Sequence, residues 1–159
     1  MPEVFANTTP LQDLHRLGRL DWRREFSGRI VVPTAVADEL EAGRRLGARV
    51  PELAEFPWIE IRRPAEPMPA FPRFMHRGEA EVLVLARTAA APLVIIDDLM
   101  ARAQAQALGL RCTGTLGVVL RAKREQPLER VAPVLARRQA EGFRLAPGTL
   151  VEVLQLAGE

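Results

Sequence analysis

The run PLVIID at residues 92–97 constrains the fold more than any other part of the sequence. Its four consecutive apolar residues, 93–96, do not alternate with polar residues as they would in a strand with one face exposed to solvent. Such a continuous apolar run is typical of a parallel strand buried on both faces. A second such run, residues 30–32, precedes a segment with helical spacing. Short apolar strands that alternate with helices predict an α/β sandwich built on a parallel sheet.

The length of the chain, 159 residues, fits one domain with one core. We expect a single domain over residues 1–159, without internal repeats. Clustered prolines predict an extended loop at about residues 62–77, because proline prevents regular structure. The last part of the chain, about residues 127–157, has the pattern of two helices joined near Gly142 to Gly148.

The charged residues mildly favour an anionic partner. There are 22 basic and 20 acidic residues, and every basic residue except Lys123 is an arginine, which can clamp phosphate with two donors. Cys112 is the only cysteine, so an internal disulfide is excluded and a reducing cytoplasm is the expected compartment. No apolar run approaches the ~18 residues needed to cross a bilayer, so no membrane association is expected.

Two adjacent carboxylates, Asp97 and Asp98, follow the apolar run 93–96. Taken alone, Asp98 is explained as the N-cap of the next helix, since Asp is among the best N-cap residues. Asp97 is harder to explain in this way. Two close carboxylates repel each other unless a cation or a proton offsets one charge, and a divalent metal ion would do so.

The first expected strand ends at Asn7, where an Asx-turn into the next helix is the plain explanation. Thr8 or Thr9 is the predicted N-cap of that helix, with Pro10 at its first position. If the first strand belongs to the same parallel sheet, its carboxyl end lies at the same edge as Asp98. Asn7 is therefore also a candidate site residue.

Three glutamates lie on helices that follow expected strands or the proline-rich loop. Glu39 borders the buried stripe of its helix. It can be a site residue, and it is equally well explained as a solvated residue beside that stripe. Glu79 and Glu81 open the most apolar helix, where the helix dipole alone favours carboxylates. They lie about 200° apart around that helix, so only one of them points easily at a given site. Together with Asn7 and Asp98, these oxygens suit Mg²⁺ or Mn²⁺.

The whole chain resembles the PIN-domain family, in particular its bacterial and archaeal branch of VapC-like nucleic-acid-binding proteins. The matching stretches cover nearly the full length and are NTTPL, GRIVVPTAVADEL, GEAEVLVLA, VIIDDLMARAQAQALGL, TGTLGVVLRAKREQ and EGFRLAPGTLVEVLQLAGE. The resemblance implies a three-layer α/β/α fold with a central mainly parallel sheet. It also implies a ribonuclease that depends on Mg²⁺ or Mn²⁺, and many members of the family are toxins of toxin–antitoxin pairs.

By this resemblance, the four acidic positions of the family fall on Asn7, Glu39, Glu79 and Asp98. Asp97 is a stand-in metal ligand for Asp98, and Glu81 is a less favoured alternative to Glu79. Thr113 and Thr115 match a polar turn that lines such sites, although a helix cap explains both. Asn7 departs from the aspartate usual in the family and should weaken metal binding through the loss of one negative charge.

The leading hypothesis is a metal-dependent endoribonuclease that prefers single strands. The basic residues expected to meet its phosphates are Arg102, Arg121, Lys123 and Arg124, for which a solvated helix face is the alternative. A small antitoxin and a homodimer are further expected partners. The rival hypothesis, motivated by Asn7, is a PIN-fold module that binds RNA or protein without catalysis. A receiver domain fits less well, because receivers carry their acidic pair after the first strand.

Overall fold

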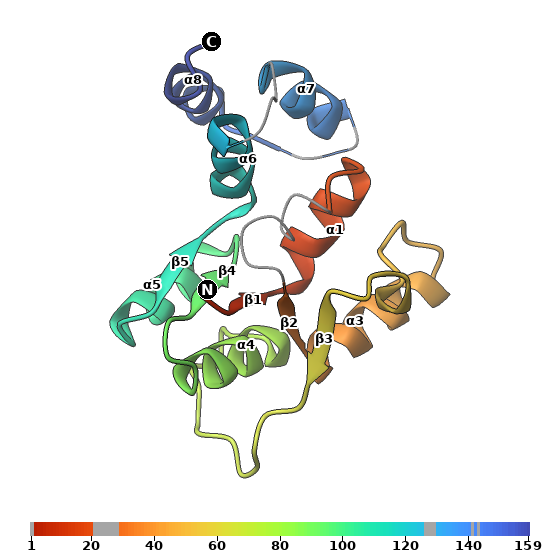
Figure 1. Ribbon diagram of the computed structural model, residues 1–159, viewed down its shortest axis with the longest axis vertical. Coiled ribbons are helices and arrows are strands. Elements are labelled where there is room, and N and C mark those ends of the chain that lie inside the picture. The colour runs from red at the N-terminus through yellow and green to blue at the C-terminus, as the bar shows by residue number, and fades with distance from the viewer. Residues whose placement is uncertain (1, 21–28, 126–129, 141, 143) are drawn as a thin grey trace.

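The computed structural model of the protein describes residues 2–20, 29–125, 130–140, 142 and 144–159 (Figure 1). Its strands form one parallel sheet in the order β3-β2-β1-β4-β5. The strands are β1 (Val4–Ala6), β2 (Ile30–Pro33), β3 (Ile59–Arg62), β4 (Leu93–Ile95) and β5 (Arg111–Thr113). The parallel sheet expected from the apolar runs is confirmed.

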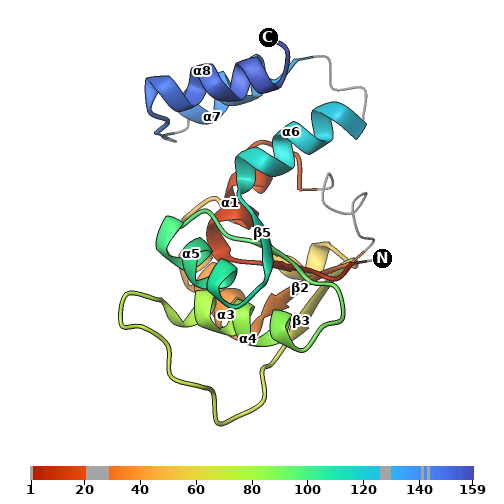
Figure 2. The same ribbon diagram turned by 90° about the vertical axis from the view of Figure 1, so that its left-hand side faces the viewer.

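Helices cover both faces of the sheet, as the α/β/α architecture requires. Figure 2 shows α4 on one side of the strands, with α1 and α6 on the other. The helices are α1 (Thr8–Arg16), α3 (Thr34–Arg45), α4 (Arg77–Arg87), α5 (Leu99–Ala107), α6 (Thr115–Glu125), α7 (Ala132–Ala140) and α8 (Pro147–Leu156), with a short 3₁₀ turn, η1 (Leu53–Glu55). In the described part of the chain, no helix is long and apolar enough to cross a membrane.

The buried strands explain why their sequences do not alternate. Phe5 of β1 and Val94 of β4 are 0 % exposed, and helix side chains pack on both faces of these strands. Val82 and Leu83 of α4 are also fully buried, which accounts for a helix that is apolar nearly all round. By contrast, β3 lies at the edge of the sheet and is only partly buried.

The start of α1 differs from the prediction. The helix begins at Thr8, so Asn7 is the N-cap, and Pro10 is the third helical residue. Proline is tolerated there because the first four N–H groups of a helix have no partner within the helix. The Asn7 side chain makes no capping hydrogen bond, so the expected Asx-turn is not formed.

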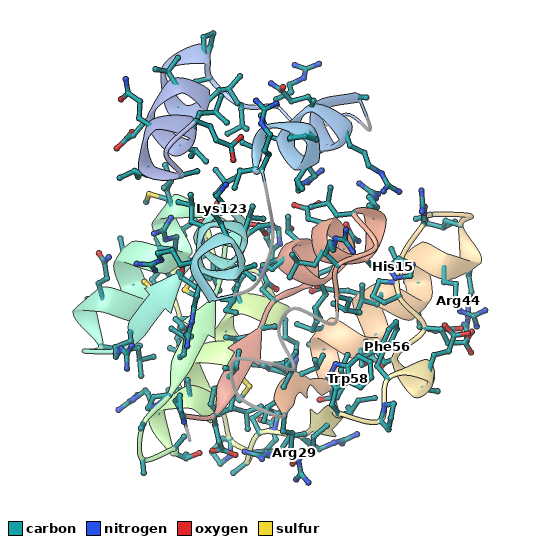
Figure 3. All side chains as sticks on the ribbon, turned by 45° about the horizontal axis from the view of Figure 1, so that its top comes forward. His15, Arg29, Arg44, Phe56, Trp58 and Lys123 are labelled. Atoms are coloured by element: carbon teal, nitrogen blue, oxygen red, sulfur yellow. The ribbon has the colours of Figure 1, made fainter. Side chains whose placement is uncertain are left out.

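An aromatic cluster holds α1 beside the segment that leads into β3. His15 of α1 meets Phe56 edge to face at a ring-centroid distance of 6.3 Å, and Phe56 meets Trp58 in the same way at 5.3 Å (Figure 3). Burial is the main reason why the pKa of His15 is lowered, with the charge of Arg49 adding to it. The cluster thus stabilises α1 on the side away from β4 and β5.

Two segments lie outside the regular layers. Residues 63–76, between β3 and α4, contain no helix or strand, in agreement with the loop expected from the prolines. The C-terminal helices α7 and α8 lie beyond α6, at the end of the molecule away from the sheet (Figures 1 and 2). The tail was predicted from residue 127; residues 126–129 lie outside the described part of the chain.

Candidate active site

The strand order changes direction between β1 and β4, and this places a crevice between them. From β1 the chain adds β2 and β3 on one side, and then β4 and β5 on the other. In open parallel sheets, ligands bind outside the carboxyl ends of the strands at such a switch point. Asn7 follows β1, and Asp97 and Asp98 follow β4 closely, so all three lie at this edge. The backbone N–H of Asn7 donates to the carbonyl of Ile95 at 3.2 Å.

A cavity of about 430 Å³ opens on this edge. Its walls come from the start of α1, from α3 and from the start of α4, and the residues are Asn7, Thr8, Thr9, Gln12, Glu39, His76 and Glu79. Asn7 is only 7 % exposed although it lines the cavity. Three of the four residues assigned from the PIN-domain resemblance therefore lie in one cavity.

Glu39 reaches the cavity from α3 and is held by a residue of α1. Its Oε2 accepts a hydrogen bond from the Thr8 hydroxyl. Gly78 makes room for it, because a Cβ at that position would lie 2.8 Å from Glu39 Oε1. Glu39 is itself exposed, as is its neighbour Asp38.

Glu79 is the buried carboxylate of the cavity, at 7 % exposure. Its Oε2 accepts from the backbone N–H of His76 at 3.1 Å, which forms a capping box at the start of α4. Burial raises the pKa of Glu79, the hydrogen bond from His76 opposes this, and the charges of Asp98 and Glu39 raise the pKa further. Glu79 is therefore within electrostatic reach of Asp98, the N-cap of α5, and of Glu39 on α3.

Asp98 and Asp97 have different partners. Asp98 is the N-cap of α5, as predicted, and its Oδ1 accepts from the N–H of Ala101 at 2.8 Å. Asp97 holds the start of α6: Oδ1 accepts from the N–H of Thr115 and Oδ2 from its hydroxyl, both at 2.6 Å. Thr115 is thus tied to Asp97, and Thr113 lies at the end of β5.

Glu81 faces α3 and not the cavity. It is 2 % exposed, and its Oε2 accepts from the N–H of Ala35 at 2.9 Å and from the Thr34 hydroxyl at 3.2 Å. Its Oε1 accepts from Nε of Arg77 at 2.8 Å. Glu81 therefore joins the start of α3 to α4, the two helices that carry Glu39 and Glu79.

The four basic residues expected to bind phosphate separate into two groups. Arg102 of α5 lies near the acidic edge, since a Cβ on Gly114 would be 3.7 Å from its Nη1 and 2.7 Å from Asp97 Oδ1. The other three, Arg121, Lys123 and Arg124, are on α6. Lys123 is bound to Glu159 at 3.1 Å and lies on the side of the C-terminal helices (Figure 3).

The donor set suits a hard divalent cation by its chemistry, since it consists of carboxylate and amide oxygens. Glu79 has a raised pKa next to two other carboxylates, and a bound cation would relieve that repulsion. Among the residues the structure describes, no three His, Cys, Asp or Glu side chains converge closely enough to form a ready-made metal cluster. Instead, Glu39, Glu79 and Asp98 each accept a hydrogen bond from a protein donor.

Sequence reasoning missed several residues that shape the site. Thr8, Gln12 and His76 line the cavity, and Arg77 binds Glu81. Thr8 follows Asn7 directly, but its contact with Glu39 spans 31 positions and depends on how α1 and α3 pack. No short-range pattern in the sequence signals such a contact.

Gly114→Ala is expected to lower the free energy of unfolding by about 1–3 kcal/mol, because the new Cβ would displace the carboxylate that holds α6. That Cβ would lie 2.7 Å from Asp97 Oδ1. Chemical denaturation measures the change. The matched control is Gly148→Ala in α8, where nothing lies within 4 Å of the new Cβ and stability should be unchanged or slightly raised. Equal effects of the two substitutions would contradict the close approach of Asp97.

Comparisons with known proteins bear on the fold and on the family. No curated protein matches the chain. Among solved structures it is similar to a PilT N-terminus (PIN) domain protein, SSO1118, from the hyperthermophilic archaeon Sulfolobus solfataricus P2. The TM-score is 0.53 and the identity 16 %, over 74 % of this chain and 90 % of that chain, and this shows a shared fold alone. The family model DUF3368, described as a PIN domain, matches residues 3–159. The chain therefore belongs to the PIN-domain family.

Proposed function

We propose that this PIN domain is a metal-dependent endoribonuclease that prefers single-stranded RNA. PIN domains are generally nucleases that use divalent metal ions. The observation that carries the proposal is the cavity at the switch point of the sheet, where Asn7, Glu39 and Glu79 meet and Asp98 acts electrostatically on Glu79. These residues come from four separate elements, and each of them would offer an oxygen atom as the ligand of a metal ion.

The residues proposed to hold Mg²⁺ or Mn²⁺ are Glu39, Glu79, Asp98 and Asn7. A divalent ion bound there would supply a water of lowered pKa and positive charge to offset the leaving oxygen of a phosphodiester. The protein contributes the positions: Thr8 orients Glu39, the backbone of His76 orients Glu79, and the first turn of α5 orients Asp98. Asp97 is engaged by Thr115, which favours Asp98 as the ligand.

Arg102 is the basic residue best placed to meet a phosphate beside the acidic edge. The α6 residues Arg121, Lys123 and Arg124 would bind the strand further away. Neutralising Arg102 should weaken RNA binding uniformly across sequences and reduce its salt dependence, since phosphate contacts carry no sequence information.

The test is cleavage of a mixed panel of single-stranded and duplex RNAs by the purified protein with Mn²⁺, Mg²⁺ or chelator. Cleavage of single strands that stops on chelation would support the proposal. An intact panel in every condition would refute it. A contaminating nuclease is excluded by Asp98→Asn protein purified in the same way, which should leave the RNA intact.

A second candidate function is a PIN-fold module that binds RNA or protein without cleavage. Asn7 favours it, since the usual aspartate would supply one more negative charge, and so does the absence of a ready-made three-ligand cluster in the described part of the chain. RNA retention that is independent of metal, without turnover, would support this function.

Asn7→Asp is expected to bind Mn²⁺ about tenfold more tightly than the wild type, because it adds a charged ligand to a site that lacks one. Calorimetric titration with Mn²⁺ measures the change, and RNA cleavage is assayed on the same samples. A rise in cleavage together with affinity would mark a weakened nuclease. Unchanged affinity would contradict the placement of Asn7 in a metal site.

The biological role that we propose for such a ribonuclease is the toxin of a toxin–antitoxin pair. A small antitoxin protein would then cover the acidic cavity, and the toxin would form a homodimer. Expression of the chain alone should arrest growth, and the Asp98→Asn variant should not. Sedimentation at micromolar concentration tests the dimer.

A further inference from the structure

A second cavity, of about 430 Å³, adjoins the acidic cavity that is lined by Asn7, Glu39 and Glu79. Its walls come from the first turns of α3, from the start of the loop after β3 and from the start of α4. Glu39 lines both cavities, so they meet at its side chain. This second cavity is called the side cavity below.

The side cavity lies at the same edge of the sheet as the acidic cavity. Thr34 follows β2 directly and Arg63 follows β3 directly, and both line the side cavity. Asn7, which follows β1 directly, lines the acidic cavity. Since parallel strands end at one edge, the two cavities form neighbouring parts of one crevice. An RNA strand bound along this edge with its scissile phosphate in the acidic cavity would bring a neighbouring nucleotide to the side cavity.

Most polar groups of the side cavity are already bonded within the protein. Glu81 accepts from the first turn of α3 and from Arg77. Nη2 of Arg77 also donates to Oε1 of Glu66 at 3.0 Å, and Oε2 of Glu66 accepts from the N–H of Met68 at 3.0 Å. These bonds connect the loop after β3 with α3 and α4, so the walls of the side cavity are held in place by the protein itself.

Two charged side chains of the side cavity have no such partners. Asp38 and Arg63 are exposed, and neither makes a hydrogen bond or an ion pair within the residues that the structure describes. Asp38 comes from α3 and offers two acceptor oxygens, and Arg63 comes from the loop and offers a planar set of N–H donors. They are the charged groups of the side cavity that a ligand can engage without breaking a bond inside the protein.

The charges of the side cavity favour a nucleobase over a phosphate. Its described lining contains four carboxylates and two arginines, and Arg77 is already paired with Glu81 and Glu66. A phosphate would therefore meet a surplus of negative charge, whereas an unstacked base is uncharged and is recognised through donors and acceptors on its edges. Guanine fits the two unbonded groups best. It donates two adjacent N–H groups to a carboxylate, and its O6 and N7 accept from an arginine.

We propose that the side cavity is a nucleobase subsite that takes a guanine next to the scissile phosphate, with Asp38 as its acceptor and Arg63 as its donor. The inference rests on the proposed function, because it assumes that RNA lies along this edge of the sheet. The subsite would supply base specificity to the reaction. Contacts to phosphate groups cannot supply it, because they carry no sequence information.

Two variants and two matched controls test the subsite. Asp38→Asn keeps the size of the side chain and removes its charge, and Arg63→Met removes the donors. Glu41→Gln on α3 and Arg73→Met on the loop change the net charge in the same way, and neither residue lines either cavity. All four residues are at the surface, so the thermal midpoint of each variant should stay within about 2 °C of the wild type.

The measurement is partial digestion of a random-sequence RNA with Mn²⁺, followed by sequencing of the cut ends. In the wild type, guanine should be enriched about tenfold at one position next to the cut, as one good bidentate contact to a base provides. The enrichment should fall below about twofold in Asp38→Asn and in Arg63→Met, because each variant removes one side of the recognition. Glu41→Gln and Arg73→Met should keep the enrichment of the wild type.

Two results of the digestion would overturn the subsite. One is a wild type with no enriched base beside the cut. The other is an enrichment that is the same in Asp38→Asn and Arg63→Met as in the wild type. Enrichment of a base other than guanine would overturn the assignment to guanine.

If the wild type cleaves no RNA, the proposed function fails, and binding decides the inference. The affinities for the labelled pentanucleotides UUGUU and UUUUU are then measured by fluorescence anisotropy in chelator. A preference of about tenfold for UUGUU that is lost in Asp38→Asn and Arg63→Met would support a base subsite in a module that does not cleave. Equal affinities, or binding of neither RNA, would overturn it.

Discussion

Replacing Glu79 by glutamine is expected to slow RNA cleavage strongly and, at the same time, to make the protein more stable at neutral pH. The cleavage rate should fall roughly 10²–10³-fold, as when one preorganised electrostatic group of an active site is lost. The free energy of unfolding at pH 7 should rise by about 1 kcal/mol, since the carboxylate is buried beside Asp98 and Glu39. For a chain of this size, the thermal midpoint would rise by about 2–4 °C.

The gain in stability should depend on pH in a defined direction. The pKa of Glu79 is raised above its ordinary value of 4.5, so the folded protein binds this proton more tightly than the unfolded chain does. Its contribution to stability is complete below pH 4.5 and is lost as the pH rises through the raised pKa. The difference between variant and wild type should therefore be largest at neutral pH and shrink on acidification.

Glu41→Gln is the matched control for this prediction. Hydrogen bonds from Arg44 and Arg45 lower the pKa of Glu41, so the sign of its effect on stability is opposite. This exposed variant should cleave RNA at the wild-type rate and gain no stability. Thermal melts from pH 4 to 8 and initial cleavage rates at pH 7 measure both effects for the two variants. Cleavage at close to the wild-type rate in Glu79→Gln would remove Glu79 from the proposed metal site.

The fold could be predicted because its main features are local in the sequence. The apolar runs at residues 30–32 and 93–96 do not alternate, and buried parallel strands require that pattern. The positions of Asn7 and Asp98 followed from the same argument, because the carboxyl ends of parallel strands share one edge. The N-cap of α1 was predicted one or two residues late, since Asn7, Thr8 and Thr9 are all acceptable capping residues.

The contacts that shape the candidate site could not be predicted, because they depend on how separate elements pack. Thr8 and Glu39 are 31 positions apart, and Asp97 and Thr115 are 18 apart. The helical spacing showed that Glu79 and Glu81 point in different directions. It did not show that Glu81 faces the first turn of α3. The spacing of residues within one helix gives their directions around that helix, but it does not say how that helix is aligned with another.

Glu81→Ala is expected to be the most destabilising of the site substitutions, at about 2–3 kcal/mol, because it leaves buried donors without an acceptor. The N–H of Ala35 and the Thr34 hydroxyl both donate to Oε2 of Glu81, which is 2 % exposed. Arg77 adds less, because its side chain is 67 % exposed and its ion pair with Glu81 is screened by solvent. Glu66→Ala, which removes the exposed second partner of Arg77, is the control and should cost less than about 0.5 kcal/mol.

Glu81→Gln distinguishes a clamp between two helices from a metal ligand. Glutamine keeps an acceptor oxygen for the N–H of Ala35, so the spacing of α3 and α4 should persist, with a loss of only about 1 kcal/mol. Mn²⁺ binding should then be close to wild type in Glu81→Gln and reduced in Glu81→Ala, where the helices carrying Glu39 and Glu79 can shift. Urea denaturation and calorimetry on the same samples measure both quantities. If Glu81→Gln instead loses Mn²⁺ binding as fully as Glu79→Gln while its stability is unchanged, Glu81 is a ligand, and the assignment of the carboxylates on α4 has to be reversed.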